Sequence, residues 1–476
     1  MNNDSIFLWK TADILNATKG ELICGDISRT FSTLATDSRL IREDEFFVAI
    51  RGGNHDGHRF CDEVIRKGVK GVLIERPMAA SLPLNDWKSK DIVCIAVPAT
   101  LTALGQLASY HRKRSNVVLT AITGSNGKTT TRKMTAEVLS QKFCTHFTEG
   151  NFNNEIGLPL TLFRLAPAHR QSVVELGMNH SGEIRRLAKI CLPDIAVITN
   201  IGPAHIEFFG TLENIMRAKG ELLEELAPDK TAVLNADDPY LMRLASERNG
   251  KIMLFGMSET AQIRAVNIRN FELGTLFTLI LPNEQVDVHL RIPGQFMVSN
   301  ALAAASVGWL NSLSADEIRA GLEKSEPVHG RMNIILLANE VYLIDDTYNA
   351  NPGSMKAAIK TLNSLKNNGR AIFVAGDMRE LGEHSPRLHE EIGAEAARSG
   401  IAKLYVTGTF AQNFADGAIL NGMAAKDVFI GTHDEIIAAL SDELKRGDRV
   451  LVKGSRAMAM EKIVQQLKLK FETKTT

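Results

Sequence analysis

Short apolar runs alternate with amphipathic stretches over most of the chain. Each apolar run ends in Gly, Asp or Asn and leads into a segment with helical periodicity. A series of this kind is typical of a parallel α/β fold. The pattern is clearest at Val117 to Thr123, Ser172 to Leu176, Ile195 to Asn200, Thr231 to Asn235, Val341 to Asp345, Ala371 to Gly376 and Val450 to Lys453.

Two breaks divide this series into three parts. One lies in the proline-bracketed region from Arg76 to Pro98, and the other lies at Ser325-Glu326-Pro327. A chain of 476 residues is too long for one ordinary domain. We therefore predict three domains: a mixed α/β domain at 1–98, a central parallel-sheet domain at 99–327 and a C-terminal Rossmann-like domain at 328–476.

Composition narrows the classes of function. The 55 basic side chains balance 55 acidic ones, and no Lys/Arg run stands out, so we expect no nucleic-acid partner. The five cysteines are scattered without a Cys-x-x-Cys pair, which fits a reducing cytoplasm. No stretch stays apolar for the ~18 residues of a membrane span, and the first residues, Met-Asn-Asn-Asp-Ser, do not resemble a signal peptide. We therefore expect a cytoplasmic protein without a membrane span.

The strongest chemical signal is the run Thr-Gly-Ser-Asn-Gly-Lys-Thr-Thr from Thr123 to Thr130, between a predicted strand and a helical stretch. It has the composition and context of a phosphate-binding loop. Its backbone N–H groups can surround phosphate oxygens, Lys128 can reach the outer phosphates, and the Thr129 hydroxyl can bind magnesium. Ile122 stands where the usual Gly-x-x-x-x-Gly-Lys spacing has its first glycine. A structural glycine-rich turn is the alternative interpretation.

Two further polar side chains are expected at the same sheet edge. Glu175 ends a predicted strand and is a candidate magnesium ligand, although a carboxylate there could instead cap a helix. His205 closes the loop from Thr199 to His205, and a histidine with a purely structural role is the alternative. In open parallel sheets, ligands gather at the carboxyl ends of the strands, so both positions favour a role in binding.

Lys219 lies in a predicted helix from about Leu212 to Leu226 and shares the apolar face of that helix with Ile215 and Leu222. Lysine is almost never fully buried without a partner, and burial lowers its pKa toward a neutral, reactive amine. The alternative is an aliphatic stem that passes the edge of the core and leaves the ammonium in water.

These residues, together with the run Asn153 to Pro159 and the pair Ala218-Lys219, resemble the central domain of the Mur ligases. Mur ligases form an amide bond by transferring the ATP γ-phosphoryl group to a carboxylate, after which an amine attacks the acyl phosphate. The resemblance implies ATP and two Mg²⁺ ions as cofactors, with Lys128, Glu175, His205 and Lys219 as catalytic residues. It further implies that Lys219 is carbamylated and binds the second magnesium with His205.

The resemblance also assigns binding roles. The metal ligands would be Thr129, Glu175, His205 and Lys219. The nucleotide contacts would be Gly124, Ser125, Asn126, Gly127, Lys128, Thr129, Thr130, Asn300, Arg331 and Asp346. One departure concerns adenine, because Phe296-Met297 stands where the family has His-Asn. An aromatic ring and a thioether can pack on a purine face, but they cannot make the hydrogen bonds of an amide.

The ends of the chain indicate the branch of the family. The runs Asp345 to Met355, Ala375 to Gly382 and Val452 to Arg456 are similar to members that add D-alanyl-D-alanine to UDP-N-acetylmuramoyl-tripeptide. Thr36 to Arg39 and Gly52 to His58 resemble their UDP-muramoyl-binding segment. The C-terminal domain would then bind nucleotide and D-alanyl-D-alanine, and the enzyme is expected to be a monomer. The substrate contacts implied are Ser38, Arg39, Asp56, His58, Asn349, Ser455 and Arg456.

Three other functions are consistent with parts of the sequence. An amino-acid-adding Mur ligase would carry an Asp-Asn-Pro-Arg type motif, which the chain lacks. A folylpolyglutamate synthase shares the central chemistry, but the segment from Thr36 to His58 argues against it. A P-loop switch or regulatory ATPase would hydrolyse ATP without an acceptor amine. The sequence leaves open whether the third residue of the tripeptide is diaminopimelate or lysine.

Overall fold

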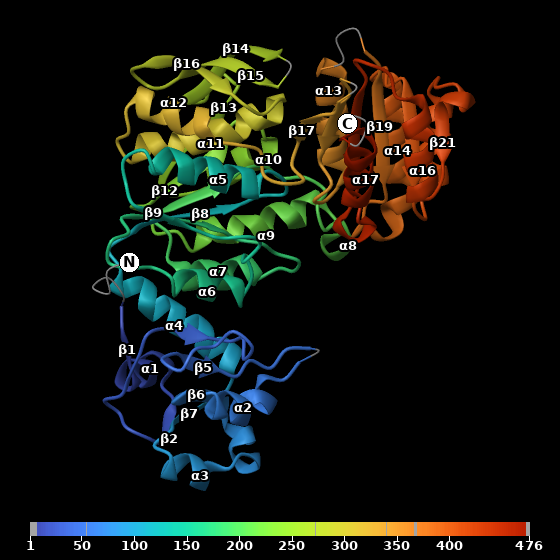
Figure 1. The fold of residues 1–476 in the computed structure, drawn as a ribbon. Helices are drawn as coiled ribbons and strands as arrows, with labels where there is room; N and C mark the ends of the chain where they lie inside the picture. The colour runs from blue at the N-terminus through green and yellow to red at the C-terminus, as the bar shows by residue number, and fades with distance from the viewer. Residues whose placement is uncertain (1–6, 54, 272, 339, 366–368, 473–476) are drawn as a thin grey trace.

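The computed structural model describes residues 7–53, 55–271, 273–338, 340–365 and 369–472. Its three large sheets follow one another along the chain, and each lies within one of the three predicted domains (Figure 1). The N-terminal part forms one end of the molecule, and the C-terminal part lies beside the central part. Among the described residues, no helix combines the length and apolar character needed to cross a membrane.

The N-terminal part is a five-stranded sheet in the order β2-β7-β6-β5-β4. Strands β4 to β7 are parallel and β2 is antiparallel, so the mixed α/β prediction is confirmed. Helix α4 (Thr100–Arg114) then leads from this sheet into the central part and packs against helices of both. The other elements are α1 (Thr11–Thr18), β2 (Glu21–Cys24), β4 (Leu34–Ala35), β5 (Phe46–Val48), α2 (Cys61–Arg66), β6 (Gly71–Glu75), α3 (Leu84–Ser89) and β7 (Val93–Val97).

The central part has a nine-stranded sheet in the order β16-β15-β14-β13-β12-β11-β8-β10-β9. The strands from β8 to β14 pair in parallel, and of these β8, β10, β11 and β12 were predicted. Strand β15 pairs antiparallel with β14 and β16, and this edge was not predicted. The strands are β8 (Val118–Thr123), β9 (Thr145–Phe147), β10 (Gln171–Glu175), β11 (Ile195–Ile198), β12 (Thr231–Asn235), β13 (Lys251–Gly256), β14 (Ile263–Phe271), β15 (Gly274–Ile280) and β16 (Gln285–Leu290).

Helices cover both faces of the central sheet, because its strands are apolar on both sides. Successive residues of β8 face opposite ways, so Ala121 and Ile122 belong to two different hydrophobic cores. Helices α5 (Lys128–Leu139), α11 (Gln295–Leu310) and α12 (Ala315–Lys324) pack on one face. Helices α6 (Gly157–Leu162), α7 (Glu183–Cys191), α9 (Leu212–Glu224) and α10 (Pro239–Glu247) contribute to the core on the other.

The C-terminal part is a six-stranded sheet in the order β17-β18-β22-β19-β20-β21, parallel except for β17. The C-terminal part was predicted as a Rossmann-like domain, and the observed architecture agrees with that prediction. The hydrophobic core on one of its faces continues into the central part. The elements are β17 (Asn333–Leu336), β18 (Tyr342–Asp345), α13 (Pro352–Leu365), β19 (Ala371–Gly376), α14 (Ser385–Arg398), β20 (Lys403–Thr407), α15 (Ala411–Leu420), β21 (Val428–Ile430), α16 (His433–Glu443), β22 (Arg449–Lys453) and α17 (Glu461–Glu472).

Candidate active site

A cavity of about 1150 Å³ lies between the central and C-terminal parts, at the carboxyl ends of β8, β10 and β11. Gly124 and Lys219 do not line it, and neither do Ser38, Arg39, Asp56 and His58 of the N-terminal part. The other predicted site residues all contribute to its wall: Ser125, Asn126, Gly127, Lys128, Thr129, Thr130, Glu175, His205, Asn300, Arg331, Asp346, Asn349, Ser455 and Arg456.

The loop between β8 and α5 is held by the loop that follows β11. Asn126 N–H donates to Asn200 Oδ1 at 2.9 Å, and Ser125 Oγ donates to the Gly202 carbonyl at 2.9 Å. Gly124 has φ +150°, and a Cβ there would lie 1.9 Å from Thr199 Oγ1, so a side chain cannot be accommodated. Helix α5 begins at Lys128 directly after the loop. The loop therefore has the rigid strand-loop-helix geometry that phosphate binding requires.

Lys128 and Glu175 lie at the mouth of this loop. Lys128 Nζ donates to the Gly124 carbonyl at 2.8 Å, and burial lowers the pKa of this amine while nearby Glu175 acts in the opposite direction. Glu175 is 3% exposed and accepts hydrogen bonds from Thr129 Oγ1 and from Asn153 Nδ2, each at 2.9 Å. Glu175 is therefore not a solvated turn residue or a helix cap. Asn153 belongs to a run noted in the sequence, but its contact with Glu175 was not predicted.

His205 also lines the cavity, in the left-handed conformation (φ +60°), immediately before α8 (Ile206–Phe209). Its Nδ1 lies 2.5 Å from Oε2 of Glu380, a residue of the C-terminal part. Hydrogen bonding from His205 lowers the pKa of the Glu380 carboxyl below its ordinary value. Glu380 was not predicted as a site residue, because nothing in the sequence indicates which residue faces His205.

Lys219 is buried in helix α9, with 2% of its surface exposed, so the predicted burial is confirmed. The amine makes no hydrogen bond or ion pair with any residue in the part of the chain that the structure describes. Burial lowers its pKa well below the ordinary lysine value, and the nearby charge of Lys128 lowers it further. Lys219 therefore resembles a neutral amine behind the cavity wall more than a solvated ammonium.

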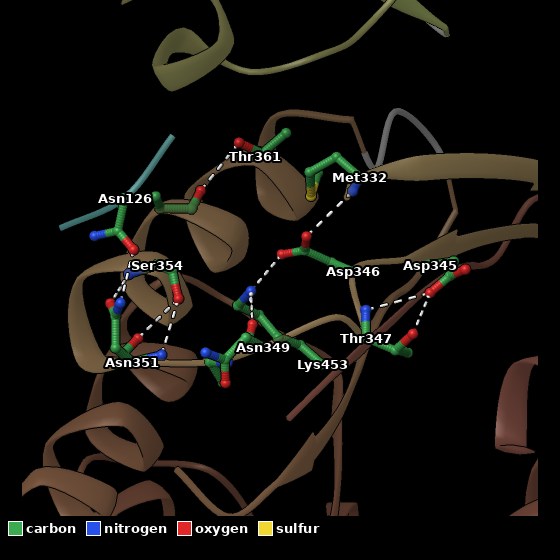
Figure 2. A network of polar contacts seen from close by, with 12 residues as sticks. Asn126, Met332, Asp345, Asp346, Thr347, Asn349, Asn351, Ser354, Thr361 and Lys453 are labelled. Atoms are coloured by element: carbon green, nitrogen blue, oxygen red, sulfur yellow. Dashed lines mark hydrogen bonds and ion pairs between the residues drawn. The ribbon is translucent and has the colours of Figure 1, made fainter. Parts of the chain in front are cut away.

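The opposite wall comes from the C-terminal part and carries a buried ion pair (Figure 2). Lys453 Nζ lies 2.6 Å from Asp346 Oδ2 and donates to the Asn349 carbonyl at 3.0 Å. Asp346 Oδ1 accepts from the Met332 N–H at 3.1 Å. Asp346 therefore already has a cationic partner, which the sequence did not predict. Burial lowers the pKa of Lys453 although Asp346 raises it.

One hydrogen bond joins the two walls directly. Asn351 Nδ2 donates to Asn126 Oδ1 at 2.7 Å, which connects the C-terminal part to the phosphate-binding loop (Figure 2). Arg331 lines the cavity with its guanidinium carbon 4.2 Å from the centre of the Tyr348 ring. These contacts position Arg331 opposite the phosphate-binding loop rather than in solvent.

Asn300 and the pair Phe296-Met297 line the cavity at the start of α11. Asn300 Oδ1 accepts from Thr131 Oγ1 at 3.2 Å, and its amide nitrogen lies 3.7 Å from the Met297 sulfur. A Cβ on Gly127 would lie 2.3 Å from Asn300 Oδ1. Asn300 is therefore packed against the phosphate-binding loop and helps to hold it.

Two of the predicted substrate contacts in the C-terminal part are fixed by neighbouring loops. The hydroxyl of Ser455 accepts from the Arg379 N–H at 2.7 Å, and Asn349 Oδ1 lies 3.4 Å from the Arg456 N–H. Arg379 lines the cavity next to Glu380. The side chains of the loops after β18, β19 and β22 thus meet at one end of the cavity.

The four predicted substrate residues of the N-terminal part lie apart from this cavity. His58 is buried between Asp56, whose Oδ1 is 2.6 Å from Nδ1, and the Glu75 N–H, which donates to Nε2 at 2.9 Å. The Ser38 carbonyl accepts from Lys67 Nζ, and the exposed Arg39 pairs with Asp37. His58 and Asp56 therefore stabilise their own domain, and the substrate roles of all four residues stay predictions. Asn54, in the same sequence run, lies outside the described residues.

The Thr129 and Glu175 oxygens suit Mg²⁺, which is commonly held by one or two carboxylates together with substrate phosphates. No group of three or more His, Cys, Asp or Glu side chains arranged around a metal occurs in the described ranges. A second cation next to His205 would need another anionic ligand. Burial lowers the pKa of the Lys219 amine, and such an amine can become an anionic ligand by reaction with carbon dioxide, so the chemistry of these side chains fits the predicted metals.

Comparison with known proteins agrees with this arrangement. The family model of the Mur ligase middle domain matches residues 122–308, and that of the Mur ligase glutamate ligase domain matches residues 330–456. UDP-N-acetylmuramoyl-tripeptide–D-alanyl-D-alanine ligase of Escherichia coli (strain K12) is 36% identical over 465 residues, which cover 97% of this chain and 98% of that protein.

Two solved structures extend the comparison to three dimensions. MurF from Acinetobacter baumannii is 32% identical and superposes with a TM-score of 0.89, over 98% of this chain and 99% of that chain. MurF from Thermotoga maritima in complex with ADP is 28% identical, with a TM-score of 0.83 over 93% and 98% of the two chains. The similarity includes the N-terminal part, which neither family model matches.

Proposed function

This chain belongs to the Mur ligase family, and from that premise we propose that it joins D-alanyl-D-alanine to UDP-N-acetylmuramoyl-tripeptide. The ATP γ-phosphoryl group passes to the terminal carboxylate of the tripeptide, and the dipeptide amine then displaces phosphate from the acyl phosphate. The products are the pentapeptide precursor of peptidoglycan, ADP and phosphate. The proposal rests on one observation, which is that the phosphate-binding loop and the loops of the C-terminal part line the same cavity.

In this proposal the phosphate-binding loop holds the ATP phosphates through the N–H groups of residues 124 to 130, with Lys128 against the outer phosphates. Thr129 and Glu175 would hold one Mg²⁺, and His205 and a carbamylated Lys219 would hold a second. When bound, the metals offset negative charge on the transferring phosphoryl group. Lys128 adds a buried positive charge to the same place, which is supported by its position 2.8 Å from the Gly124 carbonyl.

The nucleotide base would pack against Phe296 and Met297, which line the cavity beside Asn300. Arg331 would contact a phosphate and Asp346 the ribose. Asp346 keeps one oxygen on Lys453 in the present structure, so a ribose hydroxyl would share the carboxylate with that lysine. Lys453 thereby becomes a residue that orients Asp346.

Substrate binding would extend beyond the cavity. Asn349, Ser455 and Arg456 would contact D-alanyl-D-alanine, and Ser38, Arg39, Asp56 and His58 would belong to the UDP-muramoyl site. We further propose that the enzyme acts as a monomer in the cytoplasm, where ATP is available and where its five free cysteines would stay reduced.

Phosphate release from ATP tests the proposal. The purified enzyme is assayed with Mg²⁺ and bicarbonate, and the UDP-muramoyl tripeptide and D-alanyl-D-alanine are omitted in turn. We expect release that requires both substrates and yields the pentapeptide by mass spectrometry. Release with ATP alone at the same rate would instead indicate a P-loop switch or regulatory ATPase.

The modification of Lys219 has a test of its own. Removal of bicarbonate should lower activity reversibly, and Lys219→Ala should lower it by at least about a hundredfold, which corresponds to ~2.7 kcal/mol. Adding a short-chain carboxylic acid to Lys219→Ala should restore part of the activity by occupying the vacated space. Full activity of Lys219→Ala, or mass and density that show an unmodified amine in the active enzyme, would exclude the carbamate.

A further inference from the structure

Glu380 reaches across the boundary between the C-terminal and central parts. Its carboxylate lies 2.5 Å from Nδ1 of His205, and its backbone carbonyl accepts the Glu207 N–H at 3.1 Å. Helix α8 lies at this boundary, next to the C-terminal part (Figure 1). One residue of the C-terminal part therefore holds both the side chain of His205 and the backbone two residues after it.

The loop that carries Glu380 is anchored at its base. Buried Asp377 accepts the N–H groups of Thr409 and Phe410 at 2.8 and 3.0 Å, and the Met378 N–H donates to His389 Nε2 at 2.9 Å. The Arg379 N–H donates to Ser455 Oγ. The position of Glu380 is thus supported by two loops and by helix α14 of the C-terminal part.

Both partners have an unusual backbone. His205 has φ +60° and Glu380 has φ +62°, a region that residues other than glycine rarely adopt. Strained conformations of this kind persist where the surrounding structure imposes them, and they cluster at functional sites. Here two such residues face each other across one contact.

The contact also selects the form of the imidazole. A carboxylate only accepts hydrogen bonds, so a proton on Nδ1 would face Glu380, although the two groups do not have the geometry of a hydrogen bond in this structure. Nε2 would then keep its lone pair, and it makes no hydrogen bond with any residue among those that the structure describes. Metal-binding histidines commonly donate their second ring N–H to a carboxylate, which fixes the ring orientation and raises the basicity of the ligand nitrogen.

We propose that Glu380 is a positioning residue that prepares His205 to bind metal through Nε2, and that it does so only when the C-terminal part is docked on the central part. This inference rests on the metal role given to His205 above. Glu380, the residue that would orient the ring, therefore belongs to a different domain from His205, the residue that would bind the metal. Metal binding at His205 and docking of the C-terminal part then favour each other, because each is strengthened by the same contact.

Mn²⁺ titrations of the full chain test the inference. The bound ion is followed by electron paramagnetic resonance in bicarbonate buffer, with a non-hydrolysable ATP analogue present. Glu380→Ala removes the carboxylate but keeps the backbone carbonyl that accepts from Glu207. Glu380→Gln keeps an oxygen that can accept from Nδ1. Glu383→Gln is the matched control, since Glu383 is an exposed acid three residues after Glu380 whose side chain makes no hydrogen bond or ion pair with any described residue.

We expect Glu380→Ala to raise the Kd of the weaker Mn²⁺ site about tenfold or more. Glu380→Gln should have an intermediate effect and Glu383→Gln none. In a His205→Ala background, Glu380→Ala should cause little further loss, because both changes act on the same ligand. A contact with a purely structural role would not produce this order of Kd values among the variants.

Three results would overturn the inference, and they are distinguishable. If His205→Ala weakens Mn²⁺ binding but Glu380→Ala does not, the ligand role of His205 stands and the role of Glu380 is wrong. If His205→Ala binds Mn²⁺ as the wild type does, the metal role in the proposed function fails, and the inference fails with it. An equal loss on Glu380→Ala in both backgrounds would show that Glu380 acts through another residue.

Discussion

One buried lysine lies in the C-terminal wall of the cavity and another lies behind the central wall, and within the part of the chain that the structure describes only the first has a hydrogen-bond partner. Lys453, on the C-terminal side, has a carboxylate at 2.6 Å and a carbonyl at 3.0 Å. Lys219, behind the central wall, is equally buried but has no partner among the described residues. In both, burial lowers the pKa.

We infer from this difference that the partner, and not the depth of burial, decides whether a buried lysine can keep its proton. A buried ammonium with a carboxylate partner can stay charged, since the pair replaces the lost hydration in part. A buried amine without a partner avoids the desolvation cost by losing its proton, which leaves a nucleophile. The first kind of site stabilises geometry, and the second is available for chemistry such as carbamylation.

The largest expected effect on stability concerns the paired lysine. Lys453→Met would leave the Asp346 carboxylate buried without its cation, so the free energy of unfolding should fall by about 3–5 kcal/mol. Denaturant unfolding of the metal-free enzyme measures this. The double variant Lys453→Met with Asp346→Asn is the control and should recover most of the loss. A loss below about 1 kcal/mol for the single variant would mean that the pair does not stabilise this wall.

The same substitution at the unpaired lysine should have the opposite sign. Lys219→Met removes an amine whose burial is not compensated, and it keeps a side chain of similar length and apolar character. We expect the free energy of unfolding to rise by about 1–3 kcal/mol near neutral pH, although ligation should be lost. The measurement is denaturant unfolding in buffer without metal or bicarbonate. Destabilisation by Lys219→Met would contradict the comparison, because it would reveal a favourable partner.

The sequence predicted the strands that carry the central chemistry and the place of that chemistry. Residues 118–123 are a mostly apolar run followed by Gly124, and Val173-Val174 precede Glu175, so local composition marks both the strand and the site at its end. The antiparallel pairing of β15 with β14 and β16 was not predicted, since β14 and β16 alternate between exposed and buried residues and carry no motif.

The sequence was less informative about pairs that are distant along the chain. The burial of Lys219 follows from its position on a helix face, which is a local property. The partner of Asp346 is 107 residues away, and Asn351 meets Asn126 across 225 residues. Such contacts depend on how the domains dock. Glu380 was missed for this reason, and the contacts of His58 with Asp56 and Glu75 within its own domain were not predicted either, while its substrate role stays a prediction.

A smaller effect should appear in the pH dependence of stability. Between the lowered pKa of Lys219 and its unfolded value of about 10.4, the unfolded chain binds a proton that the native protein does not. Stability contributed by this difference therefore rises with pH in that window. Relative to Lys219→Met, the wild type should gain about 1–3 kcal/mol in total as the pH rises from neutral to about 10, at no more than about 1.4 kcal/mol per pH unit. If the free energies of unfolding of the wild type and of Lys219→Met change with pH in parallel, Lys219 keeps its proton in the native state.

The smallest expected effect on stability concerns an exposed ion pair, which has a partner but is not buried. Arg39 and Asp37 lie 2.7 Å apart, much like Lys453 and Asp346, but the Arg39 side chain is 83% exposed. Hydrogen bonding from Arg39 lowers the pKa of Asp37 to about 2, so any stability from the pair is present above an unfolded pKa of about 3.9 and is lost as the pH falls through about 2.

Water screens the exposed pair, so Arg39→Ala should leave the free energy of unfolding at neutral pH close to that of the wild type. If Arg39 also serves the UDP-muramoyl substrate as predicted, the KM for that substrate should rise about tenfold with little change in kcat. Arg42→Ala is the control, because Arg42 is a mostly exposed arginine of the same loop that pairs with Glu45. A loss on Arg39→Ala as large as that on Lys453→Met would contradict the comparison, since an exposed pair would then match the buried one. An unchanged KM would remove Arg39 from the substrate site and leave its role as an exposed ion pair.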